Sequence, residues 1–413
     1  MNLLIINQPD SNYGDLAAHR SLTRYIKNVF PDAHLRILSL KMNSENCEKM
    51  NVTNSEYISL SGRGARFIFF AKVIFLLKYF HFPVKFLWFF FSFYPDIKKT
   101  IGYVKWADYV ICAPGGISMG TFQNWQHILF LEIAKTFGKK LAYYSRSWGP
   151  FTEKDFWSRV YKRASLALLK EFDFHSIRDS KTMKMADELR LNYIPAIDTV
   201  FLDQPRVEIP GEIGGFIGNS DYRIFVPNTL VWHRDYKSGD PEKIKSFYLG
   251  IMRILLDRYP NDKIIMLPQL YARRTNGDES FFRMLQQEMN DCRIFVVSDK
   301  YCSDVQQTLI SNSKLVIGAR YHSIVFAINN EVPFISLSYE HKMNGLLEIL
   351  DAENRSVDIY DLKASDTTID PVLARFEKAL GENGCSIAEM RNKAHDIAQK
   401  CMDTFIAELQ NAK

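Results

Sequence analysis

The chain has 413 residues, 47% of them hydrophobic and 24% charged, a composition that excludes a disordered protein and a length that suits two globular domains. Its six cysteines include no CxxC pair and no spacing with histidine typical of zinc ligands, so neither a disulfide framework nor a metal site is indicated, and a reducing cytoplasm is expected. The net charge of +5 comes from one short segment, which argues against nucleic acid as a partner, because a groove binder would carry basic faces throughout.

The first half of the chain alternates strand-like and helix-like runs. Strands are predicted at residues 3–7 (LLIIN), 35–40 (LRILSL), 109–113 (YVICA) and 141–147 (LAYYSRS), with helices at 15–30 and 124–137. The first strand includes the amino terminus, which turns polar at Asn7 and lacks the basic start and the length of a signal peptide. Such alternation is typical of parallel strands joined by crossover helices, so we expect a Rossmann-like domain over residues 1–203.

An aromatic and basic insertion interrupts this domain at residues 62–99. Seven basic residues and one acid lie in it, and its stretch 66–94 holds eleven of the thirty phenylalanines. Lys72, Lys78 and Lys85 interrupt the apolar run, so no uncharged stretch approaches the roughly 20 residues that cross a bilayer as a helix. Pro83 is expected to divide the run into two helical pieces. Aromatic side chains with snorkelling lysines suit a segment lying at the membrane surface; the alternative is a helical hairpin buried between the domains.

The second half repeats the alternation of strands and helices. Strands are predicted at residues 223–228 (RIFVPN), 263–267 (KIIML), 293–298 (RIFVVS), 314–318 (KLVIG) and 333–339 (PFISLSY). They predict a second Rossmann-like domain at 221–375, expected to bind the donor, after a linker at 204–220 that is rich in proline and glycine near its start. Residues 376–413 are expected to be helical and to pack back on the first domain. The predicted fold class is therefore α/β, with two Rossmann-like domains facing across a cleft.

Polar or glycine-rich stretches occur at five strand-like runs. They are NYGD (12–15), APGG (113–116), SWGP (147–150), SIRD (176–179) and GARYHS (318–323). Ligands of parallel sheets bind beyond the carboxyl ends of the strands, where helix amino termini present N–H groups. Taken singly, each stretch is as well explained by a tight turn or a surface ion pair. Together they predict a binding site at the strand ends.

In this order the stretches resemble the polysaccharide pyruvyl transferase family, from about residue 12 to residue 350. The most specific part is GARYHSIVFAINNEVPFISLSYEHK, residues 318–342. One departure is clear: the family tends to have three glycines in a turn where this chain has Pro114, Gly115 and Gly116. The resemblance implies a fold similar to the GT-B glycosyltransferases and a donor, phosphoenolpyruvate, that is a co-substrate, with no cofactor. It further implies a pyruvate ketal bridging two sugar hydroxyls, commonly positions 4 and 6 of a terminal galactose or similar hexose, with release of phosphate.

The acceptor is expected to be an oligosaccharide linked to a polyprenyl diphosphate, the precursor of a capsular or other surface polysaccharide. The aromatic stretch 66–94 would hold the enzyme against the membrane that carries this precursor. We therefore expect a cytoplasmic protein peripherally associated with the inner face of the cell membrane.

Two arginines and one histidine suit this chemistry. Phosphoenolpyruvate carries a phosphate and a carboxylate, and the guanidinium groups of Arg178 and Arg320 match both anions through paired hydrogen bonds. The reaction adds a proton to the terminal vinyl carbon while a hydroxyl attacks the adjacent carbon, which calls for a general acid. His322 is the candidate, since an anionic donor beside it favours the imidazolium, and the resemblance implies the same role. The alternative is a histidine that caps its helix or bonds a neighbouring carbonyl.

The remaining candidates could have catalytic, binding or structural roles. Asp15 and Asp179 would orient an arginine or accept the proton of the acceptor hydroxyl, or else cap helices. Lys342 would add positive charge at the phosphate, and Tyr321 lies between the arginine and the histidine of GARYHS. Further substrate-binding candidates at the strand ends are Gly14, Gly115, Gly116, Ser147 and Trp148.

Several neighbouring residues are expected to be structural. Trp148 would stack on a sugar face unless it belongs to the core, as most tryptophans in so aromatic a protein do. Asp198, His127 and His175 are expected to have structural roles.

Two other functions remain open. A GT-B-type glycosyltransferase using a nucleotide sugar would need carboxylates that grip a ribose and few arginines, which GARYHS argues against. A catalytically silent, membrane-associated assembly factor would tolerate His322→Gln and Arg320→Ala without change in polysaccharide pyruvate content.

Overall fold

The computed structural model describes residues 1–8, 12–39, 55–59, 64–84, 87–115, 119–120, 123–230, 240–270, 277–363, 368–382 and 386–411. They form two compact units. Unit 1 comprises Met1–Asp10, Ala18–Leu202 and Asp396–Lys413, and unit 2 comprises Ser11–Ala17 and Asp203–His395. The chain therefore enters unit 2 briefly near its start and returns to unit 1 at its end.

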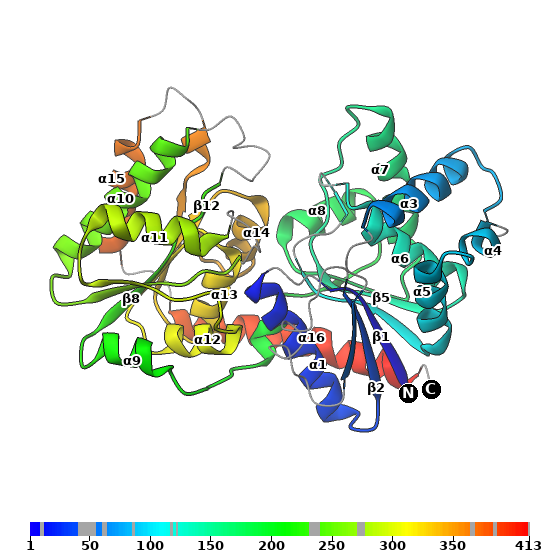
Figure 1. Ribbon diagram of the computed structural model, residues 1–413, viewed down its shortest axis with the longest axis horizontal. Helices are drawn as coiled ribbons and strands as arrows, with labels where there is room; N and C mark the ends of the chain where they lie inside the picture. Colours follow the sequence, from blue (N-terminus) through cyan, green and yellow to red (C-terminus); the bar gives the residue numbers. More distant parts are fainter. Residues whose placement is uncertain are drawn as a thin grey trace. The chain divides into compact units, whose positions relative to one another are not determined.

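Unit 1 is built on a seven-stranded sheet in the order β3-β2-β1-β4-β5-β6-β7, in which all neighbouring strands are parallel (Figure 1). The strands are β1 (Asn2–Gln8), β2 (His34–Ser39), β3 (Ser55–Ser59), β4 (Tyr109–Cys112), β5 (Lys140–Arg146), β6 (Phe174–Ile177) and β7 (Ile194–Pro195). The helices are α1 (Tyr13–Val29), α3 (Gly64–Tyr79), α4 (Leu87–Phe91), α5 (Pro95–Trp106), α6 (Trp125–Thr136), α7 (Phe156–Leu169) and α8 (Ser180–Glu188), followed by the 3-10 turn η1 (Thr199–Leu202). This strand order, which reverses between β1 and β4, is that of a Rossmann-like domain.

Successive side chains of these strands face opposite layers, as the period of a strand requires. Leu4 and Val110 belong to the core shared with α3 to α8, whereas Leu3 and Tyr109 belong to the core shared with α1 and α16 (Ile387–Gln410). Four side chains of α16 fill this second core: Cys401, Met402, Phe405 and Leu409. The end of the chain is therefore an integral layer of unit 1.

The insertion forms an outer layer, with α3 packed on α6 and α7. Phe67 and Ile74 are buried against those helices, whereas Phe69 on the opposite side is exposed. The helix ends before Pro83 and the chain becomes helical again at α4, so the predicted division into two helical pieces is confirmed. Within the described ranges, none of the helices combines the length and apolar character needed to cross a bilayer.

Two lysines of the insertion point inward. The Lys72 ammonium lies 4.8 Å from the ring centroid of Trp157, a cation–π distance. Lys78 Nζ donates to both carboxylate oxygens of the buried Glu132 at 2.7 Å. These two charges are thus engaged in packing α3 onto unit 1, a different use from the snorkelling expected of them, and Lys85 lies outside the described residues.

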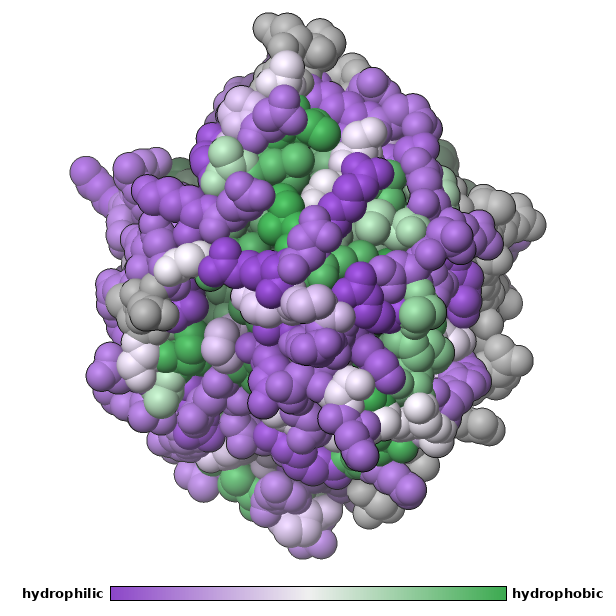
Figure 2. Space-filling view, turned by 90° about the vertical axis from the view of Figure 1, so that its left-hand side faces the viewer, coloured by the Kyte–Doolittle hydropathy of each residue, from purple (hydrophilic) through white to green (hydrophobic). Residues whose placement is uncertain are grey.

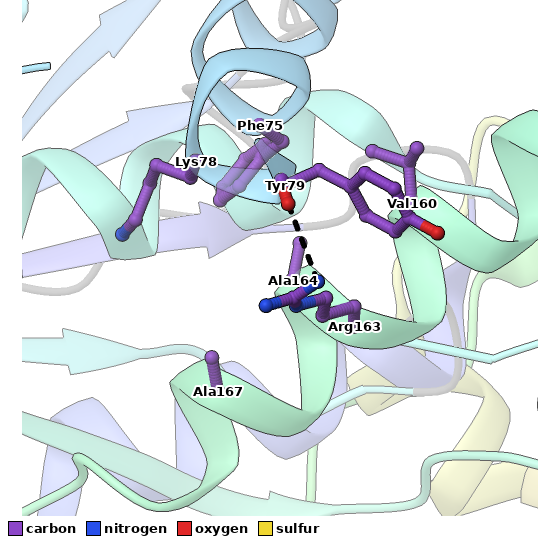
Figure 3. Close-up of a pocket in the computed structure, with 7 residues that line it drawn as sticks. All are labelled: Phe75, Lys78, Tyr79, Val160, Arg163, Ala164 and Ala167. Carbon is purple, nitrogen blue, oxygen red and sulfur yellow. Dashed lines mark hydrogen bonds between the residues drawn. The ribbon is translucent and has the colours of Figure 1, made fainter. Parts of the chain in front are cut away.

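A hollow lies between α3 and α7. Phe75, Val160 and Ala164 give it an apolar lining, and Figure 3 shows Arg163 reaching from α7 to the backbone of Tyr79. Arg163 Nη1 donates to the Tyr79 carbonyl at 3.2 Å, and its Nη2 lies 2.8 Å from a ring nitrogen of the neighbouring His81. The arginine at the edge of the hollow therefore ties the end of α3 to α7.

Three histidines are buried in unit 1, and burial disfavours their charged form. Burial, helped by the nearby Arg20, lowers the pKa of His19 to about 3, and burial lowers that of His175 to about 4. Burial also lowers the pKa of His127 well below its usual value. All three are neutral in the folded protein at mildly acidic pH, whereas in the unfolded chain they bind protons below about pH 6.5.

We therefore expect the free energy of unfolding to fall as the pH drops from about 6.5 towards 4, because the unfolded state then binds more protons than the folded one. Each histidine contributes at most about 1.4 kcal/mol per pH unit, so the three together contribute at most about 4 kcal/mol per unit, reached near pH 5. Urea unfolding at a series of pH values measures this slope. His175→Gln, which keeps an acceptor for the Trp148 indole N–H, should reduce the slope by about one third, and an unchanged slope would contradict the assignment.

Unit 2 is built on a six-stranded parallel sheet in the order β10-β9-β8-β11-β12-β13. The strands are β8 (Tyr222–Val226), β9 (Lys263–Met266), β10 (Ile294–Val296), β11 (Val316–Gly318), β12 (Phe334–Ser338) and β13 (Ser356–Asp358). The helices are α9 (Gly211–Ile217), α10 (Pro241–Arg258), α11 (Asp278–Met289), α12 (Ser303–Ser311), α13 (Tyr321–Asn329), α14 (His341–Ile349) and α15 (Asp370–Gly381). Figure 2 looks onto unit 2 from the left-hand side of Figure 1, a face on which hydrophilic side chains predominate and apolar areas are small.

The predicted α/β class with two Rossmann-like domains is confirmed. The described structure adds short strands that no apolar run marks, β3 (SEYIS), β7 and β13 (SVD), because edge strands are short and carry polar residues. Residues 204–220, expected as a linker, lie in unit 2 and include α9, which begins after Pro210 and ends before Gly218 at a positive φ of 55°. Residues 12–15, expected in the first domain, cluster with unit 2.

Candidate functional site

The stretch GARYHS lies at the point of unit 2 where the strand order reverses. β8 and β11 are neighbours in the sheet, and the connections from them run to opposite edges. β11 ends at Gly318 and α13 begins at Tyr321, so Arg320 and His322 lie just beyond the carboxyl end of the strand (Figure 1). Ligands of open α/β sheets bind at this position.

Arg320 is held by a buried carboxylate. It occupies the N-cap position of α13, but its side chain forms an ion pair with Asp278, the first residue of α11. The other oxygen of Asp278 accepts hydrogen bonds from the backbone N–H groups of Gln269 at 3.0 Å and Leu270 at 2.8 Å. Burial alone would lower the pKa of Arg320, but Asp278 and neighbouring Tyr339 outweigh it and raise the pKa. The guanidinium is therefore charged and fixed in orientation.

His322 lies in the first turn of α13 against the backbone of α1. Its ring centroid is 5.0 Å from that of Tyr321, and both side chains are buried. A Cβ added to Gly14 would lie 1.9 Å from Cγ of His322, so only glycine allows this approach. Asp15, the next residue, is buried in the first turn of α1.

Backbone contacts join the start of α1 to the end of β9. Asn12 forms a β-bridge with Leu270, and the Tyr13 N–H donates to the carbonyl of Gln269 at 2.9 Å. The Tyr13 hydroxyl also donates to the carbonyl of Asp299. The NYGD stretch thus brings Gly14 and Asp15 to the strand ends of unit 2.

The end of β12 supplies a second group of polar side chains. Lys342 Nζ lies 2.9 Å from Glu340 and 5.9 Å from the ring centroid of Tyr321. Asn228, after β8, donates to the Tyr339 hydroxyl at 2.8 Å, and burial raises the pKa of Tyr339 well above its usual value, so this phenol stays neutral. Each cation of the unit 2 site, Arg320 and Lys342, thus has an adjacent carboxylate.

The candidates of unit 1 gather around Arg178, after β6. Arg178 Nη1 donates to the buried Asp198 at 2.5 Å, and its Nε donates to the Ser147 hydroxyl at 3.4 Å. Arg178 is only 1% exposed. Asp179 accepts from the backbone N–H of Thr182 at 2.8 Å and is the N-cap of α8, the structural role left open for it.

Two further candidates of unit 1 have packing or backbone roles. Trp148 is 1% exposed and donates through its indole N–H to His175 at 3.2 Å, so its ring belongs to the core. Gly115, at the end of β4, forms a single β-bridge with Arg146 at a φ of 154°. Gly116 lies outside the described residues.

The structure thus brings Gly14, Asp15, Arg320, Tyr321, His322 and Lys342 together in unit 2, and Ser147, Arg178 and Asp179 together in unit 1. Sequence reasoning missed Asp278 and Asn228. Asn228 ends the run RIFVPN and, as a polar residue at a strand end, carries a signal that could have identified it. Asp278 follows the polar sequence ARRTNG and carries no such signal.

The family model described as polysaccharide pyruvyl transferase matches residues 12–341. A search of curated proteins found no match. Among solved structures, the chain is similar to UDP-GlcNAc 2-epimerase from Neisseria meningitidis bound to UDP-GlcNAc (11% identity, 100% of each chain, TM-score 0.56). It is also similar to a ugt transferase from Siraitia grosvenorii in complex with UDP (9% identity, 99% of each chain, TM-score 0.57). At these identities the likeness shows the fold alone, which is GT-B-like as predicted.

Proposed function

Because the chain belongs to the polysaccharide pyruvyl transferase family, we propose that it transfers the enolpyruvyl group of phosphoenolpyruvate to two hydroxyls of a sugar and releases phosphate. The observation that carries the proposal is the pairing of an oriented arginine with a histidine at the strand reversal of unit 2. A small dianionic donor needs fixed positive charge, and a carbon that gains a proton needs a nearby acid.

Arg320 is the residue proposed to bind the anionic groups of phosphoenolpyruvate. A guanidinium offers five N–H groups in a planar fork that matches phosphate or carboxylate, and Asp278 bonds a terminal nitrogen, Nη2. The ion pair fixes the direction of the fork, so little side-chain entropy is lost when an anion binds. The amino terminus of α13, after β11, and Lys342, after the neighbouring strand β12, add positive potential.

His322 is the proposed proton donor. In the proposed reaction the imidazolium protonates the terminal vinyl carbon while one sugar hydroxyl attacks the adjacent carbon and loses its proton. Phosphate then leaves with the electrons of its bond to that carbon, and the second hydroxyl adds and loses its proton to close the ketal. Asp15, beside Gly14 and buried, is the proposed acceptor of a hydroxyl proton.

We infer that the acceptor is a polyprenyl diphosphate-linked oligosaccharide ending in galactose or a similar hexose, ketalated at positions 4 and 6. An enzyme acting on such a precursor of a surface or capsular polysaccharide would work as a peripheral protein at the cytoplasmic face of the membrane. Arg178, Ser147 and Gly115 at the strand ends of unit 1 are the proposed contacts for substrate on that unit.

The test is incubation of the purified protein with phosphoenolpyruvate and a synthetic oligosaccharide acceptor. The expected product, seen by mass spectrometry, has gained pyruvate less one water, with one phosphate released per product. Phosphoenolpyruvate should also raise the melting temperature, by an amount that increases with its concentration relative to Kd. Stabilisation by a uridine diphosphate sugar and not by phosphoenolpyruvate would instead support the glycosyltransferase alternative, and stabilisation by neither would support the assembly factor.

A further inference from the structure

Among the described residues of the insertion, seven aromatic side chains are exposed. Phe80 and Phe82 follow α3, and the other five are here called the aromatic patch: Phe69, Phe89, Phe90, Phe93 and Tyr94. Their exposed fractions run from 47% for Tyr94 to 70% for Phe93. The rings form two touching groups: Phe89 lies 5.6 Å from Phe90 and 5.4 Å from Phe93, measured between centroids, while Phe69 and Tyr94 both contact Phe70. Soluble proteins rarely leave such an area in water, so we expect it to be covered.

The aromatic patch lies on the outer side of the layer formed by α3 and α4, and the inner side of α3 packs on α6 and α7. Phe70 and Phe91 join α3 to α4 at 4.6 Å between ring centroids, and both are buried. Because α3 rests on α6 and α7 through its inner side, the packing of the insertion on unit 1 leaves most of the surface of these aromatic side chains exposed. A helix of this kind normally presents polar residues outward, whereas α3 exposes Ile68 and Phe69 beside Arg66.

Cations border the patch. Arg66 lies one helical turn before Phe69, and Lys98 lies one turn after Tyr94 with Lys99 next to it; all three are exposed. The one acid of residues 62–99, Asp96, is 6% exposed. The surface therefore has an aromatic centre and a positive rim, which complements the acyl boundary and the phosphates of an anionic bilayer.

We propose that the aromatic patch inserts into the interface of an anionic phospholipid bilayer, with Arg66, Lys98 and Lys99 at the level of the phosphates. The inward-pointing Lys72 and Lys78 take no part, because Trp157 and Glu132 already engage them. The purpose of this contact rests on the proposed function, since a lipid-linked acceptor is what brings the enzyme to a membrane. The contact itself is independent of catalysis.

Co-sedimentation of the full chain with vesicles tests the proposal. Wild type should bind vesicles of phosphatidylglycerol and phosphatidylcholine more tightly than vesicles of phosphatidylcholine alone. The double variant Phe89→Gln with Phe93→Gln should partition about 10-fold less, because two large apolar side chains are lost from the interface. Lys98→Gln with Lys99→Gln should weaken binding to the anionic vesicles only. Met284→Gln, which changes an exposed apolar residue of α11 in unit 2, is the matched control and should bind as wild type does.

Equal vesicle binding by wild type and the double phenylalanine variant would overturn the proposal. A change from dimer to monomer in that variant, with vesicle binding unchanged, would instead assign the patch to contact between copies of the chain. Pyruvyl transfer to a water-soluble acceptor separates this inference from the proposed function: the phenylalanine variant should retain it while losing transfer to an acceptor embedded in vesicles. Absence of transfer to either acceptor in the wild type would count against the proposed function and leave the vesicle result standing.

Discussion

His322→Gln is expected to lower kcat for pyruvyl transfer by roughly 10²- to 10⁴-fold, the usual contribution of a general acid. Glutamine keeps a hydrogen-bonding group beside Gly14 but carries no transferable proton. Binding of phosphoenolpyruvate should change much less, because Arg320 and its partner Asp278 remain. Steady-state phosphate release gives kcat and KM, and calorimetry gives the Kd for phosphoenolpyruvate.

His34→Gln is the control for this experiment. His34 is exposed at the start of β2, so the same substitution there should leave kcat and KM unchanged. A kcat for His322→Gln within about twofold of wild type would exclude this residue as the proton donor.

Asp278→Asn is expected to lower the free energy of unfolding by about 3–5 kcal/mol, because it leaves the Arg320 guanidinium buried without its opposite charge. The backbone N–H groups of Gln269 and Leu270 both donate to the Asp278 carboxylate, and the asparagine side chain is a weaker acceptor for them. The same change should raise KM for phosphoenolpyruvate, since the guanidinium is no longer held in one orientation. Urea unfolding and steady-state kinetics measure the two effects.

Glu288→Gln, on the same helix, provides the comparison. Glu288 is 45% exposed and pairs with Lys245 at 3.2 Å, so its loss should cost at most about 1 kcal/mol and leave KM unchanged. If the two variants were equally stable, the buried pair would contribute no more than a surface pair. A KM for phosphoenolpyruvate that is unchanged in Asp278→Asn would refute the orienting role of Asp278.

The sequence predicts most of the fold because strands buried on both faces read as apolar runs. The run KLVIG becomes β11 and YVICA becomes β4, each in the middle of its sheet. The strand β3 escapes prediction because an edge strand such as SEYIS lacks that run. The inward orientation of Lys78 is also beyond sequence reasoning, since its partner Glu132 lies 54 positions away and only the packing of α3 on α6 brings them together.

Site residues that lie close together in the sequence can be predicted from it. Residues that only the fold brings together cannot. Arg320 and His322 follow from one stretch at the end of one strand. Asp278 pairs with Arg320 across 42 positions, so no local pattern marks it. Asp179 shows a different limit of sequence reasoning. An aspartate just after a strand can be either a helix cap or a catalytic base, and the sequence does not distinguish the two. The hydrogen bond from the Thr182 N–H identifies Asp179 as a cap.

The completion of unit 1 by α16 has a consequence for biosynthesis. Leu3, Ile5 and Tyr109 lie on a face of the sheet that α1 and α16 cover together, and the part supplied by α16 is missing until Met402 and Phe405 have been translated, after every residue of unit 2. At about 5–20 residues per second, ribosomes take roughly 10–40 s to make the intervening two hundred residues. The unit begun first is thus finished last, and over that interval the nascent chain exposes the apolar part of the sheet that α16 later covers, a surface suited to binding by a chaperone.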